Sequence, residues 1–176
     1  GFDCKTITTN TSDAAANAWK KLVNSGVSEW KKSPIEQLEN YIRPYYELIV
    51  ESSLTSNIPL KQALSELEFE LICVDDVVLY PAIVQSNKPW VRIISCAETE
   101  LPDPLIPPHL SGLSLHDSRS KWDEYTKAFH NAIADIHDKY NNFLASENVE
   151  LLPVGTLLNP SPYLNLLLTP KSIAYQ

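Results

Sequence analysis

The sequence predicts a helix-rich α/β fold in which a parallel sheet is flanked by helices. Two apolar runs, Leu71–Val74 and Trp90–Ile94, are separated by a segment long enough for a helix, which is the pattern of one β-α-β unit. A crossover of this kind makes the two strands parallel and buries both of their faces. A long amphipathic stretch, residues 120–145, supplies a helix to cover the sheet.

The start of the chain and the segment before the first strand each predict a short element. Residues 1–12 are polar and predict a flexible terminus. Apolar residues at helical spacing predict a helix over residues 13–24, and Gly26 is expected to end it. A further helix is expected over residues 59–67, where it leads into the β-α-β unit.

Between these two elements lies a clear helix start. Ser33 precedes Pro34 and Glu36, so the serine can cap the helix and the glutamate can complete a capping box. Apolar residues recur at helical spacing as far as Ile49. We expect Pro44 to bend this helix, because proline removes a backbone donor and clashes one turn back.

The second half of the chain predicts a loop, a helix and a strand. Four prolines and a glycine exclude continuous helix or strand from residues 97–118, and connections this long are usually functional or disordered. Apolar residues every three or four positions predict the long helix over residues 120–145. The run Tyr163–Leu168 resembles another buried strand, closed by Pro170.

Length and charge limit the class of protein. With 176 residues the chain is long enough for one domain with its own core, and we treat residues 1–176 as a single, truncated domain. The formal net charge of −8 disfavours nucleic acid as a partner, because an acidic surface repels phosphates. No apolar run approaches the roughly 20 residues of a membrane span, so no membrane partner is expected.

The cysteines and the lack of methionine bear on compartment and completeness. Cys73 and Cys96 fall within or at the end of predicted buried strands, so we interpret them as small buried hydrophobes, with a disulfide as the alternative. This usage favours a reducing, cytoplasmic compartment. The chain starts at Gly1 and contains no methionine, which favours an excised or processed segment of a longer protein.

Two acids, Asp75 and Asp76, follow the first predicted strand directly. Open α/β sheets carry their chemistry at the carboxyl ends of strands, so these acids are candidate site residues. One of them could simply cap the following helix through a backbone amide. In the functional alternative, Asp75 points into a cleft and orients a histidine by accepting its imidazole N–H. Neighbouring strand residues face opposite ways, so the two carboxylates do not easily share a substrate.

Histidines and tryptophans are the other candidates. The spacing of the four histidines, at positions 109, 116, 130 and 137, does not predict a metal site, and surface or boundary roles are expected. Most tryptophans are expected in the core. Trp90 begins a strand and Trp122 begins the long helix, so these two are the better candidates for lining an apolar pocket. The sequence has no glycine-rich phosphate cradle and no Gly-x-Ser-x-Gly turn.

Several short stretches within residues 33–176 follow one another in an order that matches a known family. They are Leu71–Val78 with Pro81 and Ala82, Pro89–Cys96, Asp103 and Pro104 with Ile106–Pro108, Ser111 with Gly112, Asp117–Ser120 with Trp122, and Ser161–Leu166. Together they resemble the amino-terminal, acceptor-binding half of UDP-glycosyltransferases of the GT-B fold, in particular a soluble branch found in bacteria and arthropods.

The resemblance implies a fold and a reaction. The chain would be an incomplete GT-B N-terminal domain, with a partial Rossmann-like parallel sheet, and its partner would be the missing carboxyl-terminal domain. The reaction would transfer a sugar from a UDP-sugar, a donor substrate rather than a cofactor, to a small lipophilic acceptor with inversion. Asp75 resembles the aspartate that holds the family's catalytic histidine, and that histidine is absent from this chain.

The acceptor pocket is expected beside this aspartate. In this interpretation the proline-rich loop, residues 97–118, forms part of the pocket wall, and the chain alone binds acceptor without transferring sugar. The residues predicted to bind the acceptor are Trp90, Ser95, Cys96, Leu105, Ile106 and Trp122.

Two alternatives and one physical consequence accompany this prediction. The chain could be a non-catalytic module that binds a hydrophobic ligand or acts as an antigen, or a small hydrolase that uses Asp75 with one of the histidines. Loss of the first strands of an α/β domain would expose a sheet edge and an apolar helix face. Self-association of the truncated domain is therefore expected.

Overall fold

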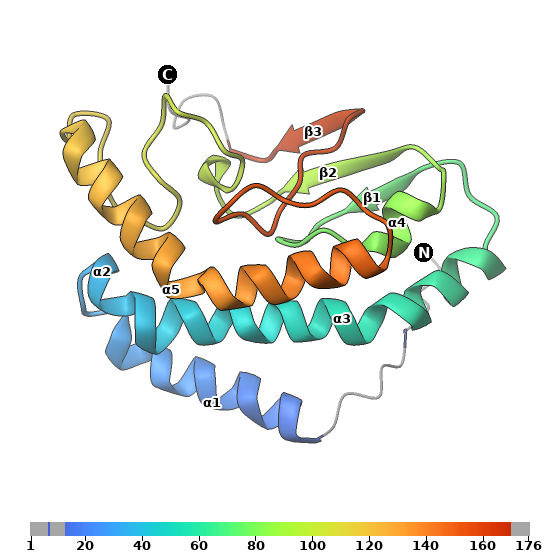
Figure 1. Cartoon of the computed structure of the whole chain (residues 1–176), viewed down its shortest axis with the longest axis horizontal. Coiled ribbons are helices and arrows are strands. Elements are labelled where there is room, and N and C mark those ends of the chain that lie inside the picture. Colours follow the sequence, from blue (N-terminus) through green and yellow to red (C-terminus); the bar gives the residue numbers. More distant parts are fainter. Residues whose placement is uncertain (1–6, 8–12, 170–176) are drawn as a thin grey trace.

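A computed structural model of the chain describes residue 7 and residues 13–169, and it places a small parallel sheet on one side of a layer of helices (Figure 1). The predicted class, α/β and rich in helix, is confirmed. The elements are, in order, α1 (Asp13–Glu29), α2 (Pro34–Gln37), a π-helical turn (Leu38–Ile42), α3 (Arg43–Glu66), β1 (Ile72–Val74), α4 (Pro81–Gln85), β2 (Trp90–Ile94), a 3-10 turn (Glu98–Glu100), α5 (Arg119–Ser146) and β3 (Leu164–Leu167).

Gly26 does not end the first helix, so that prediction is wrong. Helix α1 continues to Glu29, and Gly26 lies buried inside it. A Cβ at position 26 would lie 2.9 Å from the ring of Tyr41. The glycine therefore allows α1 to approach the π-helical turn closely, which is a packing role that the sequence pattern alone does not distinguish from a helix stop.

The predicted start of the second helix is confirmed. The backbone N–H of Ser33 donates to Oε2 of Glu36 at 2.9 Å, and the serine hydroxyl hydrogen-bonds the same oxygen at 2.5 Å. The distortion expected near Pro44 takes the form of the π-helical turn Leu38–Ile42, which directly precedes α3. Proline offers no N–H to the carbonyl one turn earlier, so a change in hydrogen-bond pattern there is the expected response.

A separate helix over residues 59–67 was predicted, but the structure has one continuous helix, α3, with Pro59 inside it. Two polar side chains of the segment before Pro59, Ser53 and Asn57, face inward. Ser53 is fully buried and hydrogen-bonds the hydroxyl of Tyr140 at 3.3 Å. Asn57 is also buried, and its Oδ1 accepts the backbone N–H of Ala82 at 3.0 Å. These contacts fix α3 to the sheet side of the molecule.

The predicted β-α-β unit is confirmed. β1 and β2 are parallel, with Cys73 opposite Val91, and the short helix α4 lies in the connection between them. β3 adds to the other side of β2, also parallel, with Ile93 opposite Leu166. The strand order is β1-β2-β3, so all three carboxyl ends lie at the same edge of the sheet.

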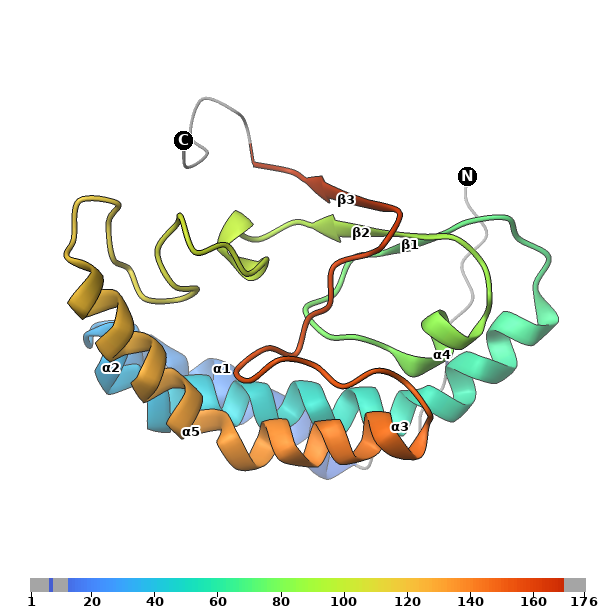
Figure 2. The same ribbon diagram turned by 45° about the horizontal axis from the view of Figure 1, so that its top comes forward.

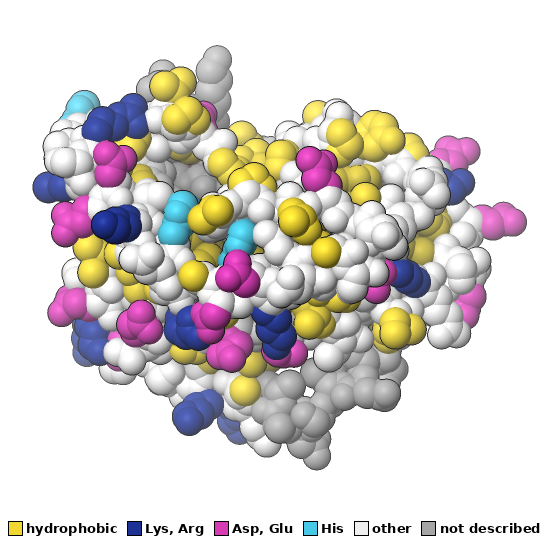
Figure 3. Space-filling model, in the orientation of Figure 1, with side chains coloured by type: hydrophobic (Ala, Val, Ile, Leu, Met, Phe, Trp, Pro, Cys, Tyr) yellow, Lys and Arg dark blue, Asp and Glu magenta, His cyan; other side chains and the backbone are white. Residues whose placement is uncertain are grey.

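Burial of every strand on both faces is not observed. Four of the five residues of β2 are buried, but β1 contributes only Val74 to the core and no residue of β3 is buried. The reason is the size of the sheet: among the described residues, β1 and β3 are both edges and the helices lie on one side only (Figure 2). Apolar side chains are exposed over the sheet as a result (Figure 3); on and beside β3 they are Tyr163, Leu164, Leu166, Leu167 and Leu168.

The same geometry overturns the prediction of buried cysteines. Cys73 lies on the edge strand β1 and Cys96 lies just beyond β2, and both are exposed free thiols rather than small core residues. The third cysteine, Cys4, and the expected flexible terminus lie outside the described residues, as does Pro170.

The core lies between α3, α5 and the loops that leave the sheet. Ile133, Tyr140 and Leu144 of α5 have no exposed surface, which confirms the apolar stripe predicted for this helix. Tyr140 and Leu144 pack against α3 and against Val78 and Leu79 of the segment after β1, whereas Ile133 packs against the π-helical turn. Among the helices described, none is both long and apolar enough to cross a lipid bilayer.

Candidate functional site

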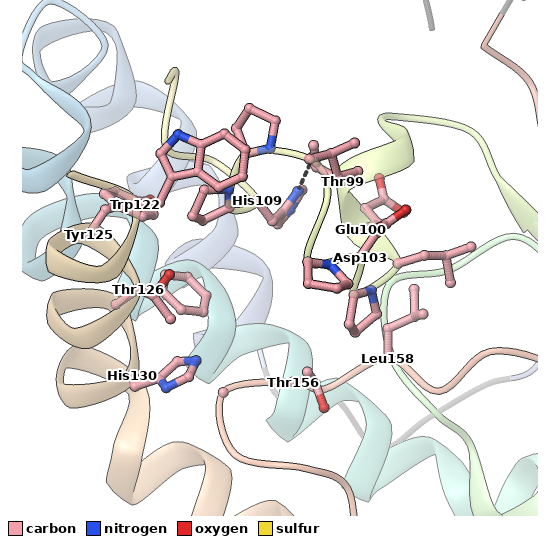
Figure 4. A pocket seen from close by; sticks show the side chains of 18 of the residues that line it. Thr99, Glu100, Asp103, His109, Trp122, Tyr125, Thr126, His130, Thr156 and Leu158 are labelled. Carbon is pink, nitrogen blue, oxygen red and sulfur yellow. Dashed lines mark hydrogen bonds between the residues drawn. The ribbon is translucent and has the colours of Figure 1, made fainter. Parts of the chain in front are cut away.

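A cavity of about 510 Å³ opens between the proline-rich loop, the first half of α5 and the turn before β3 (Figure 4). Most of its wall is apolar. Its loop residues are Thr99–Pro104 and Ile106–His109, its α5 residues are Arg119, Trp122, Asp123, Tyr125, Thr126, Phe129 and His130, and the rest are Tyr46, Val77 and Gly155–Leu158.

The loop wall is shaped by turn chemistry. Asp103 accepts the backbone N–H of Leu105 through Oδ1 at 2.8 Å, which closes a tight turn in the middle of the wall. Pro102, Pro104, Pro107 and Pro108 all line the cavity. Proline restricts the backbone and carries no N–H, so this wall keeps its shape and presents carbon rather than donors to the cavity.

The helix wall comes from one face of α5. Trp122, Thr126 and His130 follow one another at four-residue spacing, so they project to the same side of the helix. Arg119 joins the two walls at the cavity mouth. Its guanidinium lies 4.1 Å from the ring centre of Trp122 and donates to the backbone oxygen of Pro104 at 2.6 Å.

Two of the four histidines line this cavity, a role that sequence reasoning missed. Nδ1 of His109 lies 3.0 Å from the hydroxyl of Thr99 (Figure 4), and burial lowers the pKa of His109 to about 4. Burial also lowers the pKa of His130, helped by the nearby His137. Both rings are therefore neutral at pH 7. The signal available in the sequence was weak, because a lone histidine in a loop has no diagnostic spacing.

The other two histidines have no place in the cavity. His116 is exposed on the loop before α5. His137 is buried, and its Nε2–H donates to the backbone oxygen of Pro153 at 2.9 Å, which is the boundary role predicted for it. In the part of the chain that the structure describes, no group of three histidine, cysteine or acidic side chains is placed to hold a metal ion.

The two acids after β1 have different environments, which separates their roles. Asp76 accepts the backbone N–H of Val77 at 2.7 Å and the hydroxyl of Tyr80 at 2.8 Å. Its backbone oxygen also accepts a hydrogen bond from the buried Arg92 at 2.7 Å. Asp76 therefore organises the loop, although it does not cap α4, whose first turn follows Tyr80.

Asp75 faces outward instead. Its side chain is exposed, and Oδ1 accepts the hydroxyl of Ser95, the residue after β2, at 2.6 Å. The carboxyl ends of the two strands thus bring together two residues that lie 20 positions apart in the sequence. Glu100 lines the cavity and lies close enough to Asp75 to be affected by its charge. Burial raises the pKa of Glu100, and the negative charge of Asp75 raises it further.

Of the six residues predicted to bind an acceptor, Ile106 and Trp122 line the cavity. Trp90 does not, because it is a core residue that packs with Val74 and Ile83. The exposed Leu105 also lies outside the cavity, since the turn at Asp103 leaves its side chain in solvent. Ser95 and Cys96 are exposed at the sheet edge, outside the cavity wall.

Asp75 has no histidine as a hydrogen-bond partner, although all four histidines lie among the described residues. A hydrolase that pairs Asp75 with a histidine of this chain therefore has no geometric support. No family model matches the sequence, and no curated protein matches it either. The likeness to UDP-glycosyltransferases accordingly stays a prediction.

Proposed function

We propose that this chain binds a small lipophilic acceptor in the cavity and is the acceptor-binding part of a UDP-dependent glycosyltransferase. The observation that carries the proposal is the cavity of about 510 Å³ between the proline-rich loop and α5. Its volume lies within the range of about 300–1,000 Å³ that small-molecule sites occupy, and an apolar wall with a few polar groups is their usual lining.

The position of Asp75 supports the transferase part of the proposal. The carboxylate is exposed at the carboxyl edge of a parallel sheet, where an imidazole supplied by another part of a longer protein could reach it beside Ser95. Sugar transfer would need that histidine and a domain that binds the UDP-sugar. The chain by itself is therefore a binding unit without transferase activity.

The cavity itself can be tested on the isolated chain. Thr126→Tyr places a large side chain on the α5 face that lines the cavity, whereas Lys127→Tyr introduces the same side chain at the exposed neighbouring position. Isothermal titration calorimetry with 2-naphthol should show binding to the wild type and to Lys127→Tyr, and none to Thr126→Tyr. Equal binding to all three proteins would contradict the cavity as the site.

Transferase activity is tested separately. The chain alone, mixed with UDP-glucose and 2-naphthol, should form no naphthyl glucoside, and turnover would contradict the proposal. The product of the complete reading frame that contains this chain should form the glucoside. Asp75→Asn in that protein should reduce the rate at least about 100-fold if the carboxylate orients a general base.

One observation favours a second candidate, a non-catalytic module that binds a hydrophobic ligand. The carboxylate of Asp75 hydrogen-bonds Ser95, and no histidine of the chain reaches it. A complete reading frame whose product binds 2-naphthol, yet transfers no sugar from any UDP-sugar supplied, would favour this module over the transferase.

Location and self-association belong to the same proposal. The free thiols of Cys73 and Cys96 suit a reducing, cytoplasmic compartment.

The open edge strands β1 and β3, with exposed leucines on β3, are a surface through which the isolated chain would self-associate. Light scattering that stays monomeric up to millimolar concentration would contradict the association.

A further inference from the structure

His109 lines the cavity with one ring nitrogen engaged and the other making no hydrogen bond within the part of the chain that the structure describes. Nε1 of Trp122 and the hydroxyl of Tyr125 in the same wall also lack a partner there, but both atoms are shielded from the cavity space. His109 is fixed by the bond between its Nδ1 and the hydroxyl of Thr99, and both residues line the cavity. Among the described residues, no hydrogen bond is made by Nε2 of the same ring. The prolines that surround His109 carry no N–H, so the neighbouring backbone of this wall offers few competing donors.

The threonine leaves the ring free to adopt either neutral tautomer. If the Thr99 hydroxyl donates to Nδ1, then Nε2 carries the proton and donates, and if the hydroxyl accepts from Nδ1, then Nε2 accepts. A ligand hydroxyl can take the complementary role in both cases, because it is a donor and an acceptor at once. A carboxylate can use only one of the two tautomers.

The charges around the cavity also favour a neutral ligand over an anion. Three acidic side chains line it, Glu100, Asp103 and Asp123, against the single guanidinium of Arg119. That guanidinium is already engaged by the Trp122 ring and by a backbone oxygen. His109 contributes no positive charge at pH 7, because burial lowers its pKa to about 4. An anionic ligand would therefore lose its hydration in a wall where three acidic side chains outnumber one guanidinium.

We propose that Nε2 of His109 is the hydrogen-bonding anchor of this cavity, and that it selects uncharged apolar molecules with a hydroxyl group over carboxylic acids of the same shape. This inference rests on the proposed function, since it names the class of molecule that the cavity takes. His109 acts here as a specificity-determining residue of the binding step, and it has no assigned part in sugar transfer.

The experiment compares three ligands that share one ring system. The affinities of 2-naphthol, naphthalene and 2-naphthoate are measured by calorimetry at pH 7, where the first is neutral and the third is an anion. His109→Phe removes the anchor and keeps an aromatic ring. His116→Phe makes the same change at a histidine that is exposed on the loop and lies outside the cavity, and serves as the matched control.

The expected result is a selective loss. His109→Phe should weaken 2-naphthol roughly 5- to 10-fold, the effect of losing one neutral hydrogen bond, and leave naphthalene within about 2-fold. His116→Phe should leave both ligands unchanged. The wild type should bind 2-naphthoate at least about 10-fold more weakly than 2-naphthol, because the wall carries three acidic side chains against one guanidinium.

Each other result overturns a stated part of the reasoning. Equal weakening of 2-naphthol and naphthalene binding in His109→Phe would show that the histidine contributes only by its shape, and would contradict its role as a hydrogen-bonding anchor. Binding of 2-naphthoate as tight as that of 2-naphthol would end the selection against carboxylates. Failure of 2-naphthol and naphthalene alike to bind the wild type would overturn the proposed function together with this inference.

A second measurement uses the wild type alone, and so does not depend on the variant folding. The ¹⁵N chemical shift of Nε2 of His109 should move when 2-naphthol is added and stay in place when naphthalene is added. Identical responses to the two ligands would contradict a hydrogen bond from the hydroxyl to this nitrogen.

Discussion

His109 should make the stability of the fold depend on pH, and this dependence can be measured without a ligand. The perturbation is His109→Phe, which removes the titrating group and keeps a ring in the cavity wall. Burial lowers the pKa of His109 from 6.5 to about 4 in the folded chain. The unfolded chain therefore binds more protons than the folded chain at every pH between these two values.

The sign and size of the effect follow from this difference. The contribution of the neutral ring to the free energy of unfolding is complete above the unfolded pKa, and it is lost as the pH falls toward the folded pKa. Between pH 7 and pH 5 the wild type should lose about 2 kcal/mol of stability through this group. The imidazole charges in the unfolded state over this interval and stays neutral in the cavity.

Urea unfolding followed by tryptophan fluorescence at pH 7 and pH 5 is the assay. Other groups titrate as well, His130 among them, so the informative quantity is the difference between two proteins. His109→Phe should lose about 2 kcal/mol less than the wild type over this interval, and the exposed control His116→Phe should lose as much as the wild type. Equal losses in all three proteins would refute a neutral His109 with a lowered pKa.

Three substitutions test individual contacts, each by the free energy of unfolding in urea. Arg92→Met removes the donors shared by three backbone carbonyls and should cost about 2–4 kcal/mol, and a cost near zero would contradict this role. Gly155 has a backbone φ of +78°, and a Cβ at this position would lie 2.1 Å from the ring of His130. Gly155→Ala should therefore cost about 1–3 kcal/mol. An unchanged unfolding midpoint would show that the ring moves aside freely. Asp76→Asn should cost about 1 kcal/mol, because the carboxylate of Asp76 accepts two hydrogen bonds. Asp75→Asn should change the free energy of unfolding by no more than about 0.5 kcal/mol. A larger cost for Asp75→Asn than for Asp76→Asn would contradict the structural role given to Asp76.

The elements that sequence reasoning placed correctly are those with a local signal. The apolar stripe of α5 and the two runs that became β1 and β2 are read directly from residue spacing, and all three form as expected. The capping pattern at Ser33 is equally local, because its partner Glu36 is three residues away.

The errors concern features that distant residues decide. Gly26 is a close contact with Tyr41 rather than a helix end, and no local pattern separates the two roles. The stretch before Pro59 stays helical because Asn57 bonds to a backbone N–H 25 residues away. Burial of Cys73 was wrong because the number of strands in the sheet, and hence its edges, is not a property of one strand.

The candidate site was predictable only in part, for the same reason. Trp122 was found because it lies at the predicted start of an amphipathic helix, and Ile106 because the family resemblance implies that the proline-rich loop forms part of the pocket wall. Trp90 has the same residue type as Trp122, but its position on the central strand sends it into the core. His109 was missed because its environment arises only when the loop folds against α5 and shields the ring from water.

The most direct test of the account asks where a bound ligand lies. Intermolecular nuclear Overhauser effects between the ring protons of 2-naphthol and methyl groups of the chain report this in solution. Contacts to Ile106 and Leu158, which line the cavity, are the expected result. Contacts confined to Leu166 and Leu168, on the exposed side of the sheet, would contradict it and make the ligand site a surface patch.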